Sequence, residues 1–253
     1  MNPADAAQAL AWGLVAGSAL VIGGLVGWFA RLDRRVVAWV VAFGAGILIS
    51  VIAFDLMAEA FAAGGLVPSA AGFLIGAAIF TAGSLALSAY GARHRMRSTM
   101  MDDDARMRPD TSLAIALATV IDGIPEALVI GLSLIDGEGV ALAALIAIFL
   151  SNIPEALSST AGMKLAGRSA AYVFGLWGAI TALSGAFSLV GYAFFAGLSP
   201  EIVAVTQAIA AGALIALIAD TMIPEAFAET HETTGMIAAV GFLSGFALSH
   251  GLG

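Results

Sequence analysis

Four short stretches of the chain combine oxygen-bearing side chains at a spacing suited to binding a cation: DLMAEAF, DGIPEAL, SNIPEAL and TMIPEAF. Each contains a glutamate followed by alanine, with an acid or a hydroxyl four residues earlier. Because residues four apart lie about one turn apart on a helix, each pair projects from one face. The candidate metal ligands are Asp55, Glu59, Asp122, Glu126, Ser151, Asn152, Glu155, Asp220 and Glu225.

Composition predicts that these stretches lie in a membrane. Of 253 residues, 60% are hydrophobic and 11% are charged, whereas soluble domains carry about 25% charged residues. A core of this size cannot hide so much apolar sequence from water, so a bilayer is expected. The chain has no cysteine, which excludes disulfides and thiolate metal sites. The opening MNPADAAQAL lacks the basic start of a signal peptide, so we expect the first apolar run to remain as a helix.

Apolar windows of about 20 residues predict an all-α membrane protein with eight transmembrane helices in a single domain, residues 1–253. The predicted spans are 8–30, 36–61, 68–91, 112–134, 139–163, 170–196, 203–228 and 233–250. The long polar connection at 92–111 is expected to be a cytoplasmic loop.

The ten basic residues predict the orientation of these helices. They are confined to three connections: Arg31, Arg34 and Arg35; Arg93, Arg95, Arg97, Arg106 and Arg108; and Lys164 and Arg168. The other connections contain no base, and hold Asp136, Glu138, Glu201, Glu229 and Glu232. Because basic loops stay in the cytoplasm, we expect a multi-pass protein of the cell membrane with both termini outside.

Seven carboxylates lie within the predicted spans, with no Lys or Arg beside them. A charge at the bilayer centre costs about 2.5–3.5 kcal/mol even on a lenient scale, so protons or bound cations are expected to neutralise these acids. Glu126 follows Glu59 by 67 residues and Glu225 follows Glu155 by 70, so the acids are symmetric about the middle of the chain. Inverted repeats in a pseudo-symmetric 3+2+3 arrangement would produce this pattern.

Pro125, Pro154 and Pro224 each precede one of these glutamates. Proline lacks an N–H and disrupts the preceding helical turn, so we expect a carbonyl to be freed beside each carboxylate. Facing copies of the motif would then build an oxygen cage for a cation. In the alternative interpretation, the prolines only kink the helices for packing.

At these residues the chain resembles the ZIP family of divalent metal transporters, whose usual motif in spans four and five is His-Asn-x-Pro-Glu-Gly or a close variant. The resemblance covers nearly the whole chain and implies eight spans, outside termini and a binuclear metal centre. By position, Glu126 and Glu155 match the family's bridging glutamates, and Asn152 matches the polar position that precedes the second proline.

Three positions depart from the family pattern. Asp122 and Ser151 stand where the family usually has histidine or another ligand, and Gly123 stands where it usually has asparagine or aspartate. Carboxylate and water ligands suit manganese, magnesium or calcium, whereas imidazole suits zinc, so we expect a preference away from zinc. Gly123 lacks a side chain that could bind the second metal. The sequence therefore leaves open whether the site binds one ion or two. His94 in the cytoplasmic loop is expected to be a solvated residue.

Two polar clusters outside the spans allow two interpretations each. Glu229, His231 and Glu232 are expected near the outer face, with His250, where they form either a metal-collecting patch or an ordinary polar connection. Asp102, Asp103 and Asp104 are expected to be a solvated acidic run rather than a cytoplasmic metal site.

The leading functional prediction is transport of a divalent cation of the zinc, manganese or iron class toward the cytoplasm, without a chemical reaction. The cation is the substrate, no prosthetic group or nucleic acid is expected, and small residues in spans three and six would suit a homodimer. A proton or sodium pathway through the same acids is the alternative. An intramembrane hydrolase is disfavoured, because the sequence contains no HExxH, GxSxG or cysteine.

Overall fold

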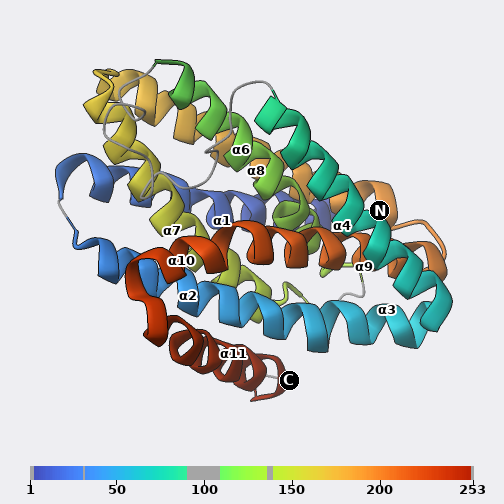
Figure 1. Cartoon of the computed structure of the whole chain (residues 1–253). Coiled ribbons are helices and arrows are strands. Elements are labelled where there is room, and N and C mark those ends of the chain that lie inside the picture. Colours follow the sequence, from blue (N-terminus) through green and yellow to red (C-terminus); the bar gives the residue numbers. More distant parts are fainter. Residues whose placement is uncertain (1–2, 31, 90–108, 136–138, 252–253) are drawn as a thin grey trace.

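Figure 1 presents the computed structural model of the chain, in which helices are the regular elements of the described part. The structure describes residues 3–30, 32–89, 109–135 and 139–251. Residues 92–108 of the predicted cytoplasmic loop, with His94 and the three aspartates, lie outside this part, as do Arg31, Asp136 and Glu138. The all-α fold class is confirmed for the described residues.

The helices follow the apolar runs of the sequence. In chain order they are α1 (Pro3–Phe29), α2 (Arg34–Val51), η1 (Ile52–Leu56), α3 (Met57–Gly64), α4 (Leu66–Ala89), α6 (Pro109–Leu132), α7 (Leu142–Leu165), α8 (Ala170–Phe195), α9 (Pro200–Leu217), η2 (Ile218–Met222), α10 (Ile223–Thr230), η3 (His231–Thr233) and α11 (Thr234–Gly251). Helix occupies most of every range predicted to span the membrane. α6 begins at Pro109, however, within the range predicted to be a loop.

Six stretches of the described residues are long and apolar enough to cross a membrane: Pro3–Phe29, Arg34–Gly64, Leu66–Ala86, Leu142–Lys164, Ala170–Phe195 and Pro200–His250. The last of these has 51 residues and contains α9, α10 and α11. α6 adds a further helix of 24 residues. These lengths indicate a multi-pass membrane protein, since about 20 apolar residues span a bilayer.

Local signals in the sequence set several helix ends. Asp33 caps α2, because its carboxylate accepts a hydrogen bond from the Arg35 N–H at 2.9 Å. Ser169 caps α8 in the same way through the Tyr172 N–H at 3.2 Å. α3 ends at Gly64 and is followed by Gly65, whose φ of 74° is a conformation that glycine adopts without strain. Asp33 and Gly65 therefore separate the segment α2–α3 from α1 before it and α4 after it.

The helices pack in two groups that meet along a shared boundary. In one group, α1 packs on α7 and α8, and α8 also packs on α6. In the other, α2 packs on α10 and α11, while α9 packs on α3 and α4. The groups meet where α2 packs on α7 and α6 packs on α9. Helices that carry candidate ligands thus lie on both sides of the boundary.

Glycines allow very close helix contacts within both groups. A methyl group on Gly46 of α2 would collide with the carbonyl of Ala238 in α11, and one on Gly212 of α9 would collide with the carbonyl of Phe73 in α4. Gly23 of α1 lies against the carbonyl of Ile153 in the same manner. Small residues therefore let backbones approach closely, as the sequence predicts for membrane helices.

Two long helical rods share the same internal layout. The segment Arg34–Gly64 consists of α2, η1 and α3, and the segment Pro200–Thr230 consists of α9, η2 and α10. Every element of the second segment has the bounds of its counterpart after a shift of 166 residues (34 and 200, 52 and 218, 57 and 223). The correspondence includes the residues at which the α-helix changes to a π-helix, Ile52 and Ile218.

That change of winding is a π-helical turn in both segments. The Met57 N–H bonds to the Ile52 carbonyl, and the Ile223 N–H bonds to the Ile218 carbonyl, so each bond spans five residues. π turns inside α-helices are rare and often lie at functional positions. η1 contains the candidate ligand Asp55 and η2 contains Asp220, so the two irregular turns place an acid on each segment.

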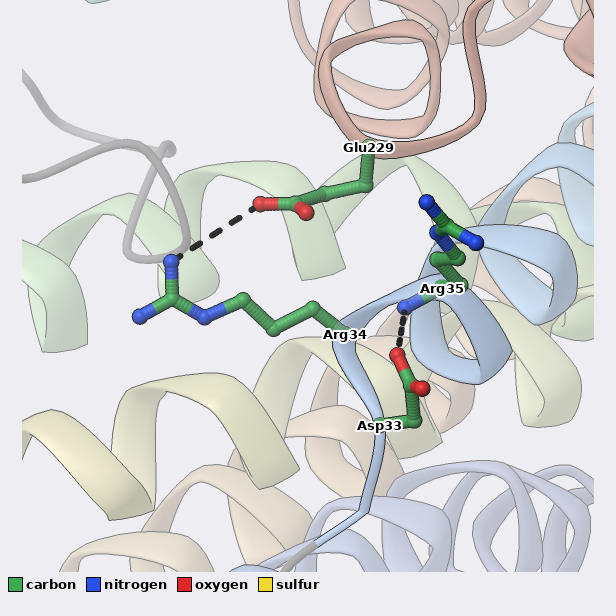
Figure 2. A network of polar contacts seen from close by, with 4 residues as sticks. All are labelled: Asp33, Arg34, Arg35 and Glu229. Carbon is green, nitrogen blue, oxygen red and sulfur yellow. Dashed lines mark hydrogen bonds and ion pairs between the residues drawn. The ribbon is translucent and has the colours of Figure 1, made fainter.

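An ion pair shows which helix ends lie together. Arg34 at the start of α2 lies 3.9 Å from Glu229 in the last turn of α10, measured from Nη1 to Oε1 (Figure 2). The prediction that places Glu229, His231 and Glu232 at the face opposite the basic connections is therefore wrong with respect to Arg34. The physical reason is that consecutive spans alternate in direction, so eight spans place the connection with Glu229 on the same side as the basic connection with Arg34.

Candidate metal-binding site

The centre of the candidate site lies between α6 and α7, which pack against each other. α6 carries Asp122 and Glu126 about one turn apart, and α7 carries Ser151 and Glu155 at the same spacing. Asp122 and Glu126 are each 5% exposed and Ser151 is 8% exposed, while Glu155 is partly buried. The structure therefore brings both sequence-predicted pairs to the interface of the two helices.

Two hydroxyl groups reach across this interface in opposite directions. Thr119 on α6 donates from Oγ1 to Oε1 of Glu155 on α7 at 2.6 Å. Ser151 on α7 lies 3.4 Å from Oε1 of Glu126 on α6, and its Oγ also lies 2.9 Å from the Ile148 carbonyl. A hydroxyl has one proton, and the carbonyl is the closer acceptor for Ser151. Glu155 is therefore held more tightly than Glu126.

Thr119 is a site residue that the sequence analysis does not include. It is 2% exposed, and it precedes Asp122 by three residues and Glu126 by seven. Those separations place all three side chains on one face of a helix. The helical spacing alone therefore contains a signal for Thr119, although a threonine in a membrane helix usually bonds to its own backbone.

The electrostatics of the central site are dominated by like charges. Glu126 is affected by the charges of Glu155 and Asp122, which both carry the same sign as Glu126 itself. Bringing carboxylates together in a region screened from water is unfavourable unless a cation or a proton accompanies them. The arrangement therefore favours occupancy by a positive charge.

Two further residues define the edges of the central site. Asn152 is 6% exposed, and its Nδ2 lies 3.5 Å from the Ala16 carbonyl of α1, which is a long, weak hydrogen bond. A side chain at Gly123 would meet no other atom within 4 Å, so space lies next to Asp122. Asn152 thus contacts the neighbouring helix, while Gly123 leaves room beside the acids.

The prolines do not interrupt the two central helices. α6 continues through Pro125 and α7 continues through Pro154, and both remain α-helical. Pro224 lies in the first turn of α10, directly after η2. The expected opening of the helix is therefore not observed at Pro125 and Pro154, whereas the turn before Pro224 is π-helical and contains Asp220. A proline inside a helix removes one N–H donor without necessarily ending the helix when neighbouring helices support it.

The acids of the first rod contact residues on other helices. Asp55 accepts a hydrogen bond from Ser249 of α11 at 3.1 Å, and it also interacts electrostatically with His250. Glu59 accepts a hydrogen bond from Gln207 of α9 at 2.8 Å. Gln207 is 5% exposed, and it is a second polar residue that the sequence analysis does not include.

The acids of the second rod are as accessible as those of the first, in which Glu59 is exposed and Asp55 is partly buried. Asp220 is exposed and Glu225 is partly buried, while Thr221 beside them is 8% exposed. In the described part of the chain, no three His, Cys, Asp or Glu side chains come close enough together to hold a metal ion. The cage of acids from four helices therefore stays a prediction.

Comparison with known protein families finds no family model that matches the chain, and comparison with curated proteins finds no match either.

Proposed function

We propose that this protein transports a divalent metal cation across a membrane, through a site centred on Glu126 and Glu155. One observation carries the proposal: the buried Glu126 lies at the interface of two membrane-length helices, where the negative charges of Asp122 and Glu155 act on it. Acids are rare in membrane helices and usually mark a pathway for ions or protons. The hydroxyls of Thr119 and Ser151 complete an oxygen-rich surface.

The donor set supports a hard cation as substrate. The central side chains offer carboxylate, hydroxyl and amide oxygens, which suit manganese or magnesium better than zinc. Asp122 and Ser151 replace the imidazole expected from the ZIP pattern. A manganese-like ion within the zinc, manganese or iron class is therefore the proposed substrate, carried without a chemical reaction toward the end of the bundle that bears Arg34.

An architecture of eight spans with inverted 3+2+3 repeats is part of the proposal. Its support is the shift of 166 residues between the two rods and the matched packing around them. α2 packs on α11 as α9 packs on α4, and α1 packs on α7 as α8 packs on α6. Repeats of this kind place a substrate site at their interface. Movement of α6 and α7 against the flanking helices would expose the site alternately to each side.

Uptake of radioactive manganese into vesicles that contain the purified protein tests this function. We expect the double variant Glu126→Ala/Glu155→Ala to lose uptake, because no carboxylate from either central glutamate remains to replace the water around the ion. Glu201→Ala is the matched control, since Glu201 is an exposed acid in the first turn of α9. Uptake by the double variant at the rate of the control would rule out transport through this site.

A proton or sodium pathway is the second candidate function. The observation that favours it is that no three ligand-type side chains are gathered for a metal in the described residues. Buried acids and hydroxyls also suit proton relays. Vesicles loaded with a pH-sensitive dye, in medium freed of divalent metals, separate the two candidates. Proton flux that depends on Glu126 without metal would favour the alternative.

A further inference from the structure

We infer that Thr119 is a positioning residue that makes the central site prefer a small octahedral cation, such as Mn²⁺ or Mg²⁺, over Ca²⁺. The inference rests on the proposed function, and it adds a residue and a selection rule to it. The residue acts through Glu155, whose oxygen it holds, and contact between Thr119 and the ion is not required.

The geometry that carries this inference is a short hydrogen bond between two helices. The Thr119 hydroxyl donates to Oε1 of Glu155 at 2.6 Å, and Thr119 is 2% exposed. Short hydrogen bonds to a carboxylate are about twice as strong as those between neutral groups. A buried threonine also has few alternative rotamers. Oε1 of Glu155 is therefore fixed in direction relative to α6.

A fixed oxygen changes how a glutamate can bind metal. Ca²⁺ takes six to eight oxygens and readily uses both oxygens of one carboxylate, whereas Mg²⁺ demands a near-octahedral shell of single oxygens. Mn²⁺ accepts the same octahedral oxygen shell. The hydrogen bond from Thr119 occupies one lone pair of Oε1 and limits its rotation, so Oε2 is the freer ligand atom of Glu155. Binding through one oxygen is then favoured, which disfavours Ca²⁺.

Glu126 provides the contrast within the same site. Its Oε1 lies 3.4 Å from Ser151, whose proton has a closer acceptor in the Ile148 carbonyl. This contact is too long to fix the carboxylate strongly. Glu126 can therefore adjust to ions of different size, and the selection against Ca²⁺ depends on Glu155 and its threonine.

Competition between calcium and manganese in the vesicle assay tests the inference. In Thr119→Val the side chain keeps its shape but loses the hydroxyl, and we expect Ca²⁺ to inhibit Mn²⁺ uptake at a concentration about tenfold lower, the effect of one hydrogen bond to a charged group. Thr119→Ser keeps the hydroxyl and should retain the original preference. Thr181→Val is the matched control, because Thr181 donates to the Gly17 carbonyl at 2.8 Å, between α8 and α1.

The outcomes separate this inference from the proposed function. Thr119→Val with an unchanged ratio of Ca²⁺ inhibition to Mn²⁺ uptake overturns the inference alone. An equal shift in Thr181→Val also overturns it, because the effect would then not depend on Glu155. Absence of divalent-cation uptake by the unmodified protein overturns both. If Thr119→Val does not fold, Glu155→Asp shortens the carboxylate out of reach of Thr119, and the same shift toward Ca²⁺ is expected.

Discussion

The segments Arg34–Gly64 and Pro200–Thr230 share a backbone layout but differ in the residues that could bind an ion. After the shift of 166 residues, Glu59 corresponds to Glu225, whereas Asp55 corresponds to Thr221. Asp220 of the second segment corresponds to Phe54 of the first. The backbone is thus repeated and one glutamate is kept, while the aspartate has moved by one position, so the two segments present different polar surfaces.

The comparison also identifies what causes the π turns. η2 is followed by Pro224, but the corresponding position after η1 is Ala58. Both turns nevertheless end with the same five-residue hydrogen bond. The turn therefore does not depend on proline, and packing of the rods against their neighbours accounts for it better than local backbone chemistry.

The partners of the two glutamates differ as well. Glu59 is bonded to Gln207 of the second segment, and the residue that corresponds to Gln207 in the first segment is Val41, which is 6% exposed. Valine cannot donate a hydrogen bond to Glu225. The hydrogen bond between Glu59 and Gln207 is therefore not repeated between Glu225 and Val41.

The largest change in stability is expected at the glycine contacts, and it tests whether the two segments pack equally closely against their neighbours. Gly46→Ala and Gly212→Ala should each lower the free energy of unfolding in detergent by up to about 3 kcal/mol, because the added methyl collides with a backbone carbonyl. Gly44→Ala is the control, since its methyl would lie 3.6 Å from the nearest atom, the Ser151 nitrogen. Thermal unfolding in which only one of the two glycines is sensitive would contradict equal packing.

A smaller effect is expected at the amide that distinguishes the segments. Gln207→Leu should lower the free energy of unfolding by about 1 kcal/mol, because Glu59 loses one charged hydrogen bond but remains accessible to solvent. The effect should disappear in the background Glu59→Ala if the two side chains act as a pair. A double-mutant cycle measured by thermal unfolding checks this, and purely additive effects would disprove the coupling.

The smallest effect is expected at the proline that only one segment has. Pro224→Ala should cost about 0.5 kcal/mol through greater freedom of the unfolded chain, and η2 should persist because η1 forms beside Ala58. Hydrogen exchange of the Ile223 amide, which bonds to the Ile218 carbonyl, measures the turn directly. Faster exchange at Ile223 alone would show that the proline does hold the π turn.

Sequence reasoning located the helices because apolar length is a strong signal. The range 170–196 nearly coincides with α8 (Ala170–Phe195), and 8–30 lies almost wholly within α1. Sequence reasoning did not locate η1 and η2, because no characteristic residue pattern marks a π turn. The prolines pointed to openings in α6 and α7 that packing against neighbouring helices prevents.

The sequence predicts how the candidate ligands pair along their helices, but their role as metal ligands stays a prediction, and the residues that support them were not predicted. The spacing of four placed Asp122 with Glu126 and Ser151 with Glu155, and the structure brings these pairs to one interface. Thr119 lay on the same helical face and was overlooked. The sequence shows Gln207 only as a polar residue within an apolar run. It does not show that Gln207 faces Glu59, because that contact depends on how the helices pack.

The contact between Arg34 and Glu229 allows the orientation of the helix bundle in the membrane to be measured by labelling one or two introduced thiols. The chain contains no cysteine, so a thiol introduced at Asp33 or at Glu232 would be the sole reactive group in its variant. Asp33 is next to Arg34 and Glu232 lies three residues after Glu229, so we expect a membrane-impermeant maleimide to reach both thiols from the same compartment. A single accessible thiol at either position would then assign that compartment to one entire end of the protein.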